Sequence, residues 1–173
     1  MACSGLHTGA QAQTFQEGVN YAVIEPPVST QAAEGKVEVA EVFWYGCPHC
    51  YNLECSIGTY LKQKPDYGIY AHTRHDQSEL GFHGKVFYVG RMLDPDGSKD
   101  VHTKIFEAIH KQRRRIGNDD QLQRFFEGLG FKTADINNAM KSMELQTELA
   151  YARDIAEKYG WIRYRPLLSM ANT

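Results

Sequence analysis

Residues 43–51 read Phe-Trp-Tyr-Gly-Cys-Pro-His-Cys-Tyr, and this stretch decides the fold of the chain around it. An apolar, β-prone run over residues 37–45 precedes the two cysteines, and apolar residues at helical spacing follow them. The pattern predicts a strand, a tight turn and a helix, with Cys47 at the helix N-terminus. Free backbone N–H groups and the positive end of the helix dipole stabilise a thiolate there, so a lowered pKa is predicted for Cys47.

Pro48 and His49 separate the two cysteines. His49 can add positive charge or a hydrogen bond to the Cys47 thiolate. Pro48 sits near the first helical position, where its missing N–H has little effect. Cys50 is close enough in sequence to form a small disulfide with Cys47, so the pair can cycle between dithiol and disulfide.

A Cys-x-x-Cys motif can also be half of a zinc site. Zinc usually takes four ligands, and the remaining cysteines, Cys3 and Cys55, are single with no histidine pair at the required spacing. The strand–turn–helix setting therefore favours a redox centre over zinc. The predicted catalytic residues are Cys47, His49 and Cys50, supported by Pro48, with no metal and no cofactor.

The run from Cys47 to Tyr51 resembles the active site of the DsbA family, which are periplasmic disulfide oxidases with a thioredoxin fold. Residues 15–18, Phe-Gln-Glu-Gly, followed by Tyr21, resemble the approach to the first strand of that family. Glu41, six positions before Cys47, matches the buried acid beneath its active site. The resemblance extends from about residue 15 to residue 160.

This resemblance implies an α/β, thioredoxin-like fold with an all-helical insertion and an incomplete C-terminal strand and helix. Residues 1–14 are expected to form a disordered tail. The thioredoxin-like domain is expected over residues 15–77 and 143–173, and the helical insertion over residues 78–142.

The implied function is donation of the Cys47–Cys50 disulfide to cysteine pairs of reduced or unfolded exported proteins in the periplasm. A membrane quinone-linked thiol oxidase is implied as the partner that restores the disulfide. Three alternatives remain open: a reductase or isomerase with the same motif, a non-enzymatic metal-binding module, and an inactive truncated product. The Pro-His pair between the cysteines favours the oxidase among the redox alternatives.

Two acidic residues, Glu38 and Glu41, interrupt the predicted central strand. They could lie on a solvated edge. For Glu41 the resemblance favours burial near the cysteines, where a carboxyl with a raised pKa could exchange a proton with Cys50.

The other elements are predicted from hydrophobic periodicity and capping residues. Two more strands are expected, over residues 21–24 and 67–75. A helix is expected after Cys50 as far as about residue 64. Further helices are expected around residues 86–93, over 101–111, after caps at Asn118 and Thr133, and over 145–159.

Length and composition limit the function classes. The chain has 173 residues and a formal net charge of −2, which fits one domain and gives no sign of a nucleic-acid partner. The basic run at residues 111–115 is best explained as the C-terminal end of a helix, where cations are favoured. Apolar runs are too short to span a bilayer.

The first and the last residues of the sequence each suggest a hypothesis. Residues 2–5, Ala-Cys-Ser-Gly, resemble the cleavage end of a bacterial lipoprotein signal, which predicts a lipid on Cys3 unless the match is chance. Residues 161–173 lack the expected proline loop and strand. Codons can be chosen for these residues that, when read in a shifted frame, encode Asp-Ser-Val-Pro-Ser-Leu-Val-Val-Asn-Gly-Lys-Tyr. That segment has the expected loop, proline and strand. A frameshift is therefore expected, with no cis-proline role for Pro166.

Overall fold

The computed structural model describes residues 14–27, 33–34, 39–63, 69–73 and 79–158. Two parallel strands, β1 (Val39–Phe43) and β2 (Ile69–Thr73), form its sheet, with Glu41 opposite Ala71 in the register. Helix α1 (Pro48–Gln63) connects them. Parallel neighbours need such a crossover, so this strand–helix–strand unit confirms the predicted arrangement around the cysteines.

β1 ends two residues earlier than predicted, at Phe43, because the chain turns before the cysteines. The backbone N–H of Cys47 donates to the carbonyl of Trp44 at 2.9 Å and closes this turn. A Cβ on Gly46 would lie 2.3 Å from the Trp44 ring. Glycine is therefore required where the chain passes this close to the indole.

The predicted strand at residues 21–24 is wrong. The chain forms a single bridge between Glu17 and Tyr21 there, and the Gly18 N–H donates to the Tyr21 carbonyl at 2.8 Å. Tyr21, Val23 and Ile24 are exposed, and no neighbouring strand pairs with them among the described residues. A short apolar run becomes a strand only where a partner supplies backbone hydrogen bonds.

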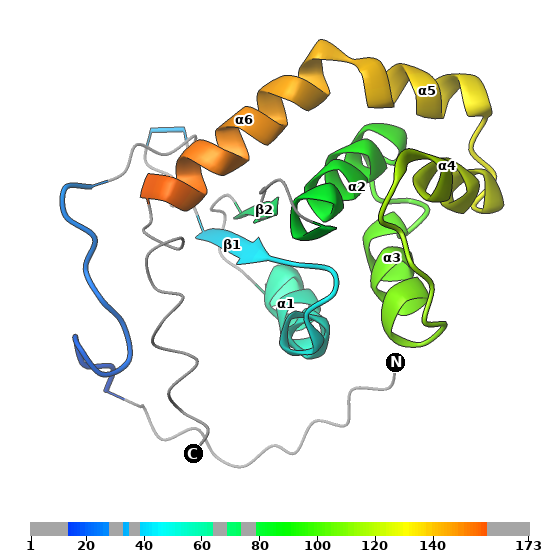
Figure 1. The fold of residues 1–173 in the computed structure, drawn as a ribbon. Helices are drawn as coiled ribbons and strands as arrows, with labels where there is room; N and C mark the ends of the chain where they lie inside the picture. Colours follow the sequence, from blue (N-terminus) through cyan, green and yellow to red (C-terminus); the bar gives the residue numbers. More distant parts are fainter. Residues whose placement is uncertain (1–13, 28–32, 35–38, 64–68, 74–78, 159–173) are drawn as a thin grey trace.

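Five helices follow the sheet, as the change of periodicity predicts. They are α2 (Glu79–Leu93), α3 (Val101–His110), α4 (Asp119–Gly128), α5 (Thr133–Lys141) and α6 (Met143–Lys158). α2 contacts α3, α5, α6 and β2, and α3 contacts α1. In Figure 1 the sheet lies between α1 and α6, and α2 to α5 gather on one side of it.

Capping was predicted correctly for α4 and wrongly for α5. The side chain of Asn118 accepts a hydrogen bond from the Gln121 backbone N–H at 2.9 Å, as an N-cap should. Thr133 is the first helical residue of α5, and Lys132 takes the cap position. The Thr133 hydroxyl donates to Glu127 of α4 at 2.7 Å and so does not cap its own helix.

An aromatic cluster joins β1 to the helical block. Phe43 packs edge-on against Phe87 of α2 at 5.4 Å between ring centroids, and Tyr45 packs against Phe106 of α3 at 4.8 Å. All four side chains are buried. Edge-to-face contacts of this kind add to the free energy gained by burial. The cluster therefore fixes the turn before the cysteines against α2 and α3.

Replacing Phe106 by alanine should lower the free energy of unfolding by about 3–5 kcal/mol, because the ring is fully buried and its removal leaves a cavity. Urea unfolding followed by circular dichroism measures the change. Met143→Ala is the control, since its side chain is 79% exposed, and it should stay within about 0.5 kcal/mol of wild type. Equal losses in both variants would contradict the proposed role of the cluster.

Candidate active site

Cys47 directly precedes α1, at the position the sequence predicts. Its carbonyl accepts the first helical hydrogen bond, from the Tyr51 N–H at 3.1 Å, and its sulfur lies 3.5 Å from the Cys50 backbone nitrogen. Cys47 and Cys50 are both free thiols in this structure. The Cys47 sulfur thus accepts a hydrogen bond from an N–H group at a helix N-terminus, where negative charge is favoured.

The four residues of the motif differ in exposure. Pro48 and His49 are exposed, whereas Cys47 and Cys50 are half-buried. Burial is the main cause that raises the pKa of Cys50 to about 11, with contributions from Cys47 and the charge of Glu41. A hydrogen bond with the Trp44 backbone opposes the rise. Cys50 therefore keeps its proton at neutral pH.

Glu41 is half-buried on β1 and lies near the cysteine pair, as the resemblance implies and unlike a solvated edge residue. Burial raises the pKa of its carboxyl, and the negative charge of Glu54 raises it further. A carboxyl with a raised pKa near a half-buried thiol is suited to proton exchange with that thiol. Glu38 lies outside the described residues.

A hydrogen-bonded group beside Glu41 was missed in the sequence. The Nε2 atom of His102 on α3 lies 3.3 Å from Oε2 of Glu54 on α1, and its Nδ1 atom lies 2.7 Å from the Tyr45 hydroxyl. One local signal existed: Glu54 follows Cys50 by four residues and shares its helix face. His102 is 57 residues from Tyr45, so no sequence spacing could reveal their contact.

His110, at the end of α3, holds the same turn from another side. Its Nε2 donates to the Tyr45 carbonyl at 2.8 Å, and its ring stacks on Tyr51 with 4.6 Å between centroids. A hollow of about 330 Å³ lies beside this region, with Tyr45, His102 and Arg91 in its lining. Two histidines of α3 therefore position the residues that flank the cysteine pair.

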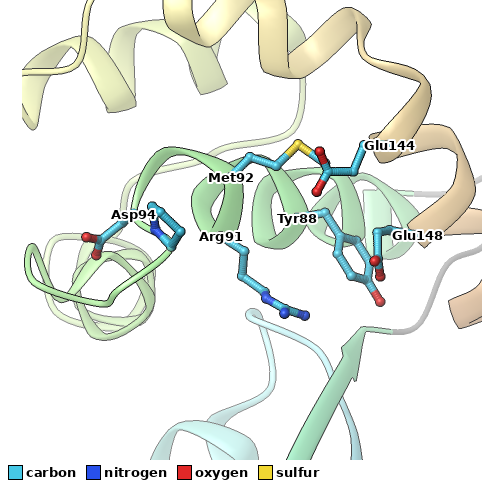
Figure 2. A pocket seen from close by; sticks show the side chains of 7 residues that line it. Tyr88, Arg91, Met92, Asp94, Glu144 and Glu148 are labelled. Carbon is cyan, nitrogen blue, oxygen red and sulfur yellow. The ribbon is translucent and has the colours of Figure 1, made fainter. Parts of the chain in front are cut away.

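A second hollow of about 280 Å³ is lined by residues of α2 and α6 and by none of the cysteines (Figure 2). In Figure 2 the Tyr88 side chain of α2 lies beside Glu148 of α6, and Met92 lies near Glu144. Burial of Tyr88 is the main cause of its raised pKa, and the charge of Glu148 adds to it. We assign this hollow no part in the chemistry of the cysteines.

The site combines two cysteines, separated by two residues, at the N-terminus of a helix that follows a parallel strand. Together with the helical block, this arrangement defines a class of protein. That class is the thiol–disulfide oxidoreductases with a thioredoxin-like fold and a helical insertion. No family model matches the chain. Comparison with individual proteins nevertheless shows that the chain belongs to the DsbA family.

The similar curated proteins are named thiol:disulfide interchange protein DsbA. The Pseudomonas syringae protein is 30% identical over 162 residues, covering 92% of this chain and 74% of its relative. The Pseudomonas aeruginosa protein is 29% identical over 151 residues, covering 87% and 70%. These matches establish a protein disulfide oxidoreductase of the DsbA type.

Solved structures agree with the sequence comparison. A single-site variant of Pseudomonas aeruginosa DsbA superposes with a TM-score of 0.76 at 27% identity, covering 84% of this chain and 78% of the other. An oxidoreductase of Neisseria meningitidis gives 0.71 at 27% identity, covering 82% and 74%. The predicted thioredoxin-like fold is thereby confirmed.

In a Cys47→Ser variant, the Cys50 thiol should still titrate above the ordinary range of cysteine, because burial and the Glu41 charge remain. Ultraviolet absorbance of the thiolate against pH measures this. Adding Glu41→Gln removes one negative charge and should lower the pKa of Cys50 relative to Cys47→Ser alone. A Cys50 that titrates at or below the ordinary cysteine value would contradict the geometry.

Proposed function

We propose that this chain oxidises cysteine pairs of reduced or unfolded exported proteins by donating the Cys47–Cys50 disulfide. The observation that carries the proposal is the asymmetry of the two sulfurs. Cys47 sits at the start of α1, whereas burial raises the pKa of Cys50 to about 11. Cys47 is thus placed for thiol–disulfide exchange, and Cys50 is placed to retain its proton.

The reaction proceeds in two exchanges. A substrate thiolate attacks the Cys47 sulfur, the Cys47–Cys50 bond breaks, and its electron pair goes to Cys50, which takes up a proton. The second substrate thiolate then attacks the substrate sulfur that is bound to Cys47. The bond between that sulfur and Cys47 breaks, and Cys47 leaves as a thiolate. The substrate loses two electrons and gains a disulfide, and the chain is reduced to the dithiol.

Each site residue has a role in this scheme. Cys47 forms the mixed disulfide, and Cys50 is the first leaving group. His49, exposed between them, stabilises the reduced form through the Cys47 thiolate, and Pro48 shapes the first helical turn. Glu41 is assigned to proton exchange with Cys50, since burial raises the pKa of its carboxyl.

The periplasm is the compartment that fits this chemistry, because an oxidising disulfide has little use in a reducing cytosol. A membrane quinone-linked thiol oxidase would return the dithiol to the disulfide. Within the described residues, no helix has the length and apolar character needed to cross a bilayer. Lipid attachment at Cys3 stays a prediction, because that residue lies outside the described residues.

The other hypotheses from the sequence gain no support. Among the described residues, no group of three or more histidine, cysteine or acidic side chains could hold a metal ion. The domain boundaries at residues 77–78 and 142–143 stay predictions. The frameshift hypothesis concerns residues 161–173, which lie outside the described residues, and sequencing the gene tests it.

A direct test uses the oxidised full chain and a reduced, unfolded protein that contains a cysteine pair. The substrate should lose its free thiols as the Cys47–Cys50 disulfide is reduced. One cysteine pair of the substrate should be oxidised for each disulfide that the chain loses. Cys47→Ser and Cys50→Ser should each abolish the transfer. If the wild-type chain transfers no disulfide, or either variant does so at the wild-type rate, the proposed function is wrong.

Replacing His49 by alanine should make the disulfide a weaker oxidant, because the Cys47 thiolate loses a stabilising neighbour. The DsbA family is the established example of this effect, so its direction is expected from the family. A tenfold change in the exchange equilibrium with glutathione corresponds to about 30 mV. Asn52→Ala, an exposed change on the same helix, serves as the control and should leave the equilibrium unchanged.

A further inference from the structure

His110 contacts both sides of the turn that carries Cys47. Its Nε2 atom donates to the carbonyl of Tyr45, two residues before Cys47, at 2.8 Å. Its ring stacks on Tyr51 of α1, with 4.6 Å between centroids and 3° between planes. The Tyr51 N–H in turn donates to the Cys47 carbonyl at 3.1 Å. One side chain of α3 thus joins the residue that leads into the turn to the helix that leaves it.

His102 makes the same kind of connection about two helical turns earlier on α3. Its Nδ1 atom shares a hydrogen bond with the Tyr45 hydroxyl at 2.7 Å, and its Nε2 atom lies 3.3 Å from Oε2 of Glu54 on α1. Tyr45 is 1% exposed, so its polar groups have little access to water and gain from each protein partner. The two histidines therefore hold Tyr45 to α1 at two separate points.

The turn that these histidines hold places the Cys47 sulfur. The Cys47 N–H donates to the Trp44 carbonyl at 2.9 Å, and the sulfur accepts the Cys50 N–H at 3.5 Å. Cys47 and Cys50 are free thiols here, so these contacts belong to the reduced form of the pair. An N–H group at a helix N-terminus stabilises a thiolate. Contacts that keep the turn in this geometry therefore favour the reduced state.

We propose that His102 and His110 are positioning residues for disulfide exchange: they hold the Cys47 turn in its dithiol geometry and so make the disulfide a stronger oxidant. Both act through Tyr45 and α1. A disulfide whose reduced form is stabilised is donated more readily. The inference rests on the thiol–disulfide chemistry of the proposed function, and it adds two residues of the helical block to the groups that set the exchange equilibrium.

The experiment equilibrates the full chain with reduced and oxidised glutathione. Two glutathione thiols lose two electrons and form one glutathione disulfide as the Cys47–Cys50 disulfide becomes a dithiol. Acid quenching and alkylation then separate the two forms of the chain. His110→Phe keeps an aromatic ring beside Tyr51 but removes the donor to the Tyr45 carbonyl. The equilibrium should shift about two- to tenfold toward the disulfide form of the chain, as expected for one lost hydrogen bond.

Tyr45→Phe tests the second contact separately. It removes the hydroxyl that His102 reaches and leaves the backbone carbonyl for His110, and it should shift the equilibrium in the same direction. His110→Gln keeps an N–H donor and should shift the equilibrium less than His110→Phe does. Thr103→Ala, an exposed change on the same helix, is the matched control and should leave the equilibrium unchanged.

A general loss of packing predicts a different result. It would destabilise the oxidised and the reduced chain equally and leave the glutathione equilibrium unchanged. Positioning requires a larger loss of stability in the reduced form. Urea unfolding of both forms measures this difference, which must match the shift in the equilibrium because the two measurements close one thermodynamic cycle.

An unchanged equilibrium in folded His110→Phe overturns the role of His110, and an unchanged equilibrium in folded Tyr45→Phe overturns that of His102. Equal losses of stability in the two redox forms overturn both roles. If His110→Phe does not fold, His110→Ala takes its place under the same criterion. Exchange with glutathione uses no protein substrate. A wild-type chain that equilibrates with glutathione but oxidises no protein would thus refute the proposed function and leave this test intact.

Discussion

Tyr45 is the residue on which the arrangement of the site depends, because both of its polar ends are held by α3. Its hydroxyl shares a hydrogen bond with Nδ1 of His102, and its carbonyl accepts from His110. Its ring is buried against Phe106 of the same helix. Tyr45 lies two residues before Cys47, so these contacts place the start of α1 relative to the helical block. The position of the reactive sulfur is thereby set by tertiary contacts as well as by the local turn.

The half-buried carboxyl of Glu41 makes the stability of the fold depend on pH. Its pKa is raised in the folded chain, so the folded state binds this proton more tightly than the unfolded state does. The resulting stabilisation is complete below the ordinary pKa of a glutamate and is lost as the pH rises through the raised value. A Glu41 that carries its charge at neutral pH would therefore weaken the fold.

The sequence was sufficient wherever a feature is local. The strand–turn–helix around Cys47, the cap at Asn118 and the helical periodicity all depend on residues a few positions apart. It failed where a partner lies far along the chain. The apolar run at residues 21–24 has no strand beside it among the described residues, and His102 reaches Tyr45 across 57 residues. The Thr133 cap failed for a more local reason, since its hydroxyl bonds to Glu127 of the preceding helix. Family resemblance supplied Glu41, but neither periodicity nor motif spacing pointed to Glu54 and His102 as a pair.

The helical block therefore completes the site and does more than cover the sheet. Without α3 the Tyr45 hydroxyl and carbonyl would lose their described partners, and an unsatisfied buried polar group costs about 1–3 kcal/mol. Glu54 would lose its histidine donor at the same time. The strand–helix–strand unit holds the cysteines, but the groups that orient Tyr45 and Glu54 come from outside it. Packing of α3 against α1 and β1 thus holds Tyr45 and Glu54 in place next to the turn that leads to Cys47.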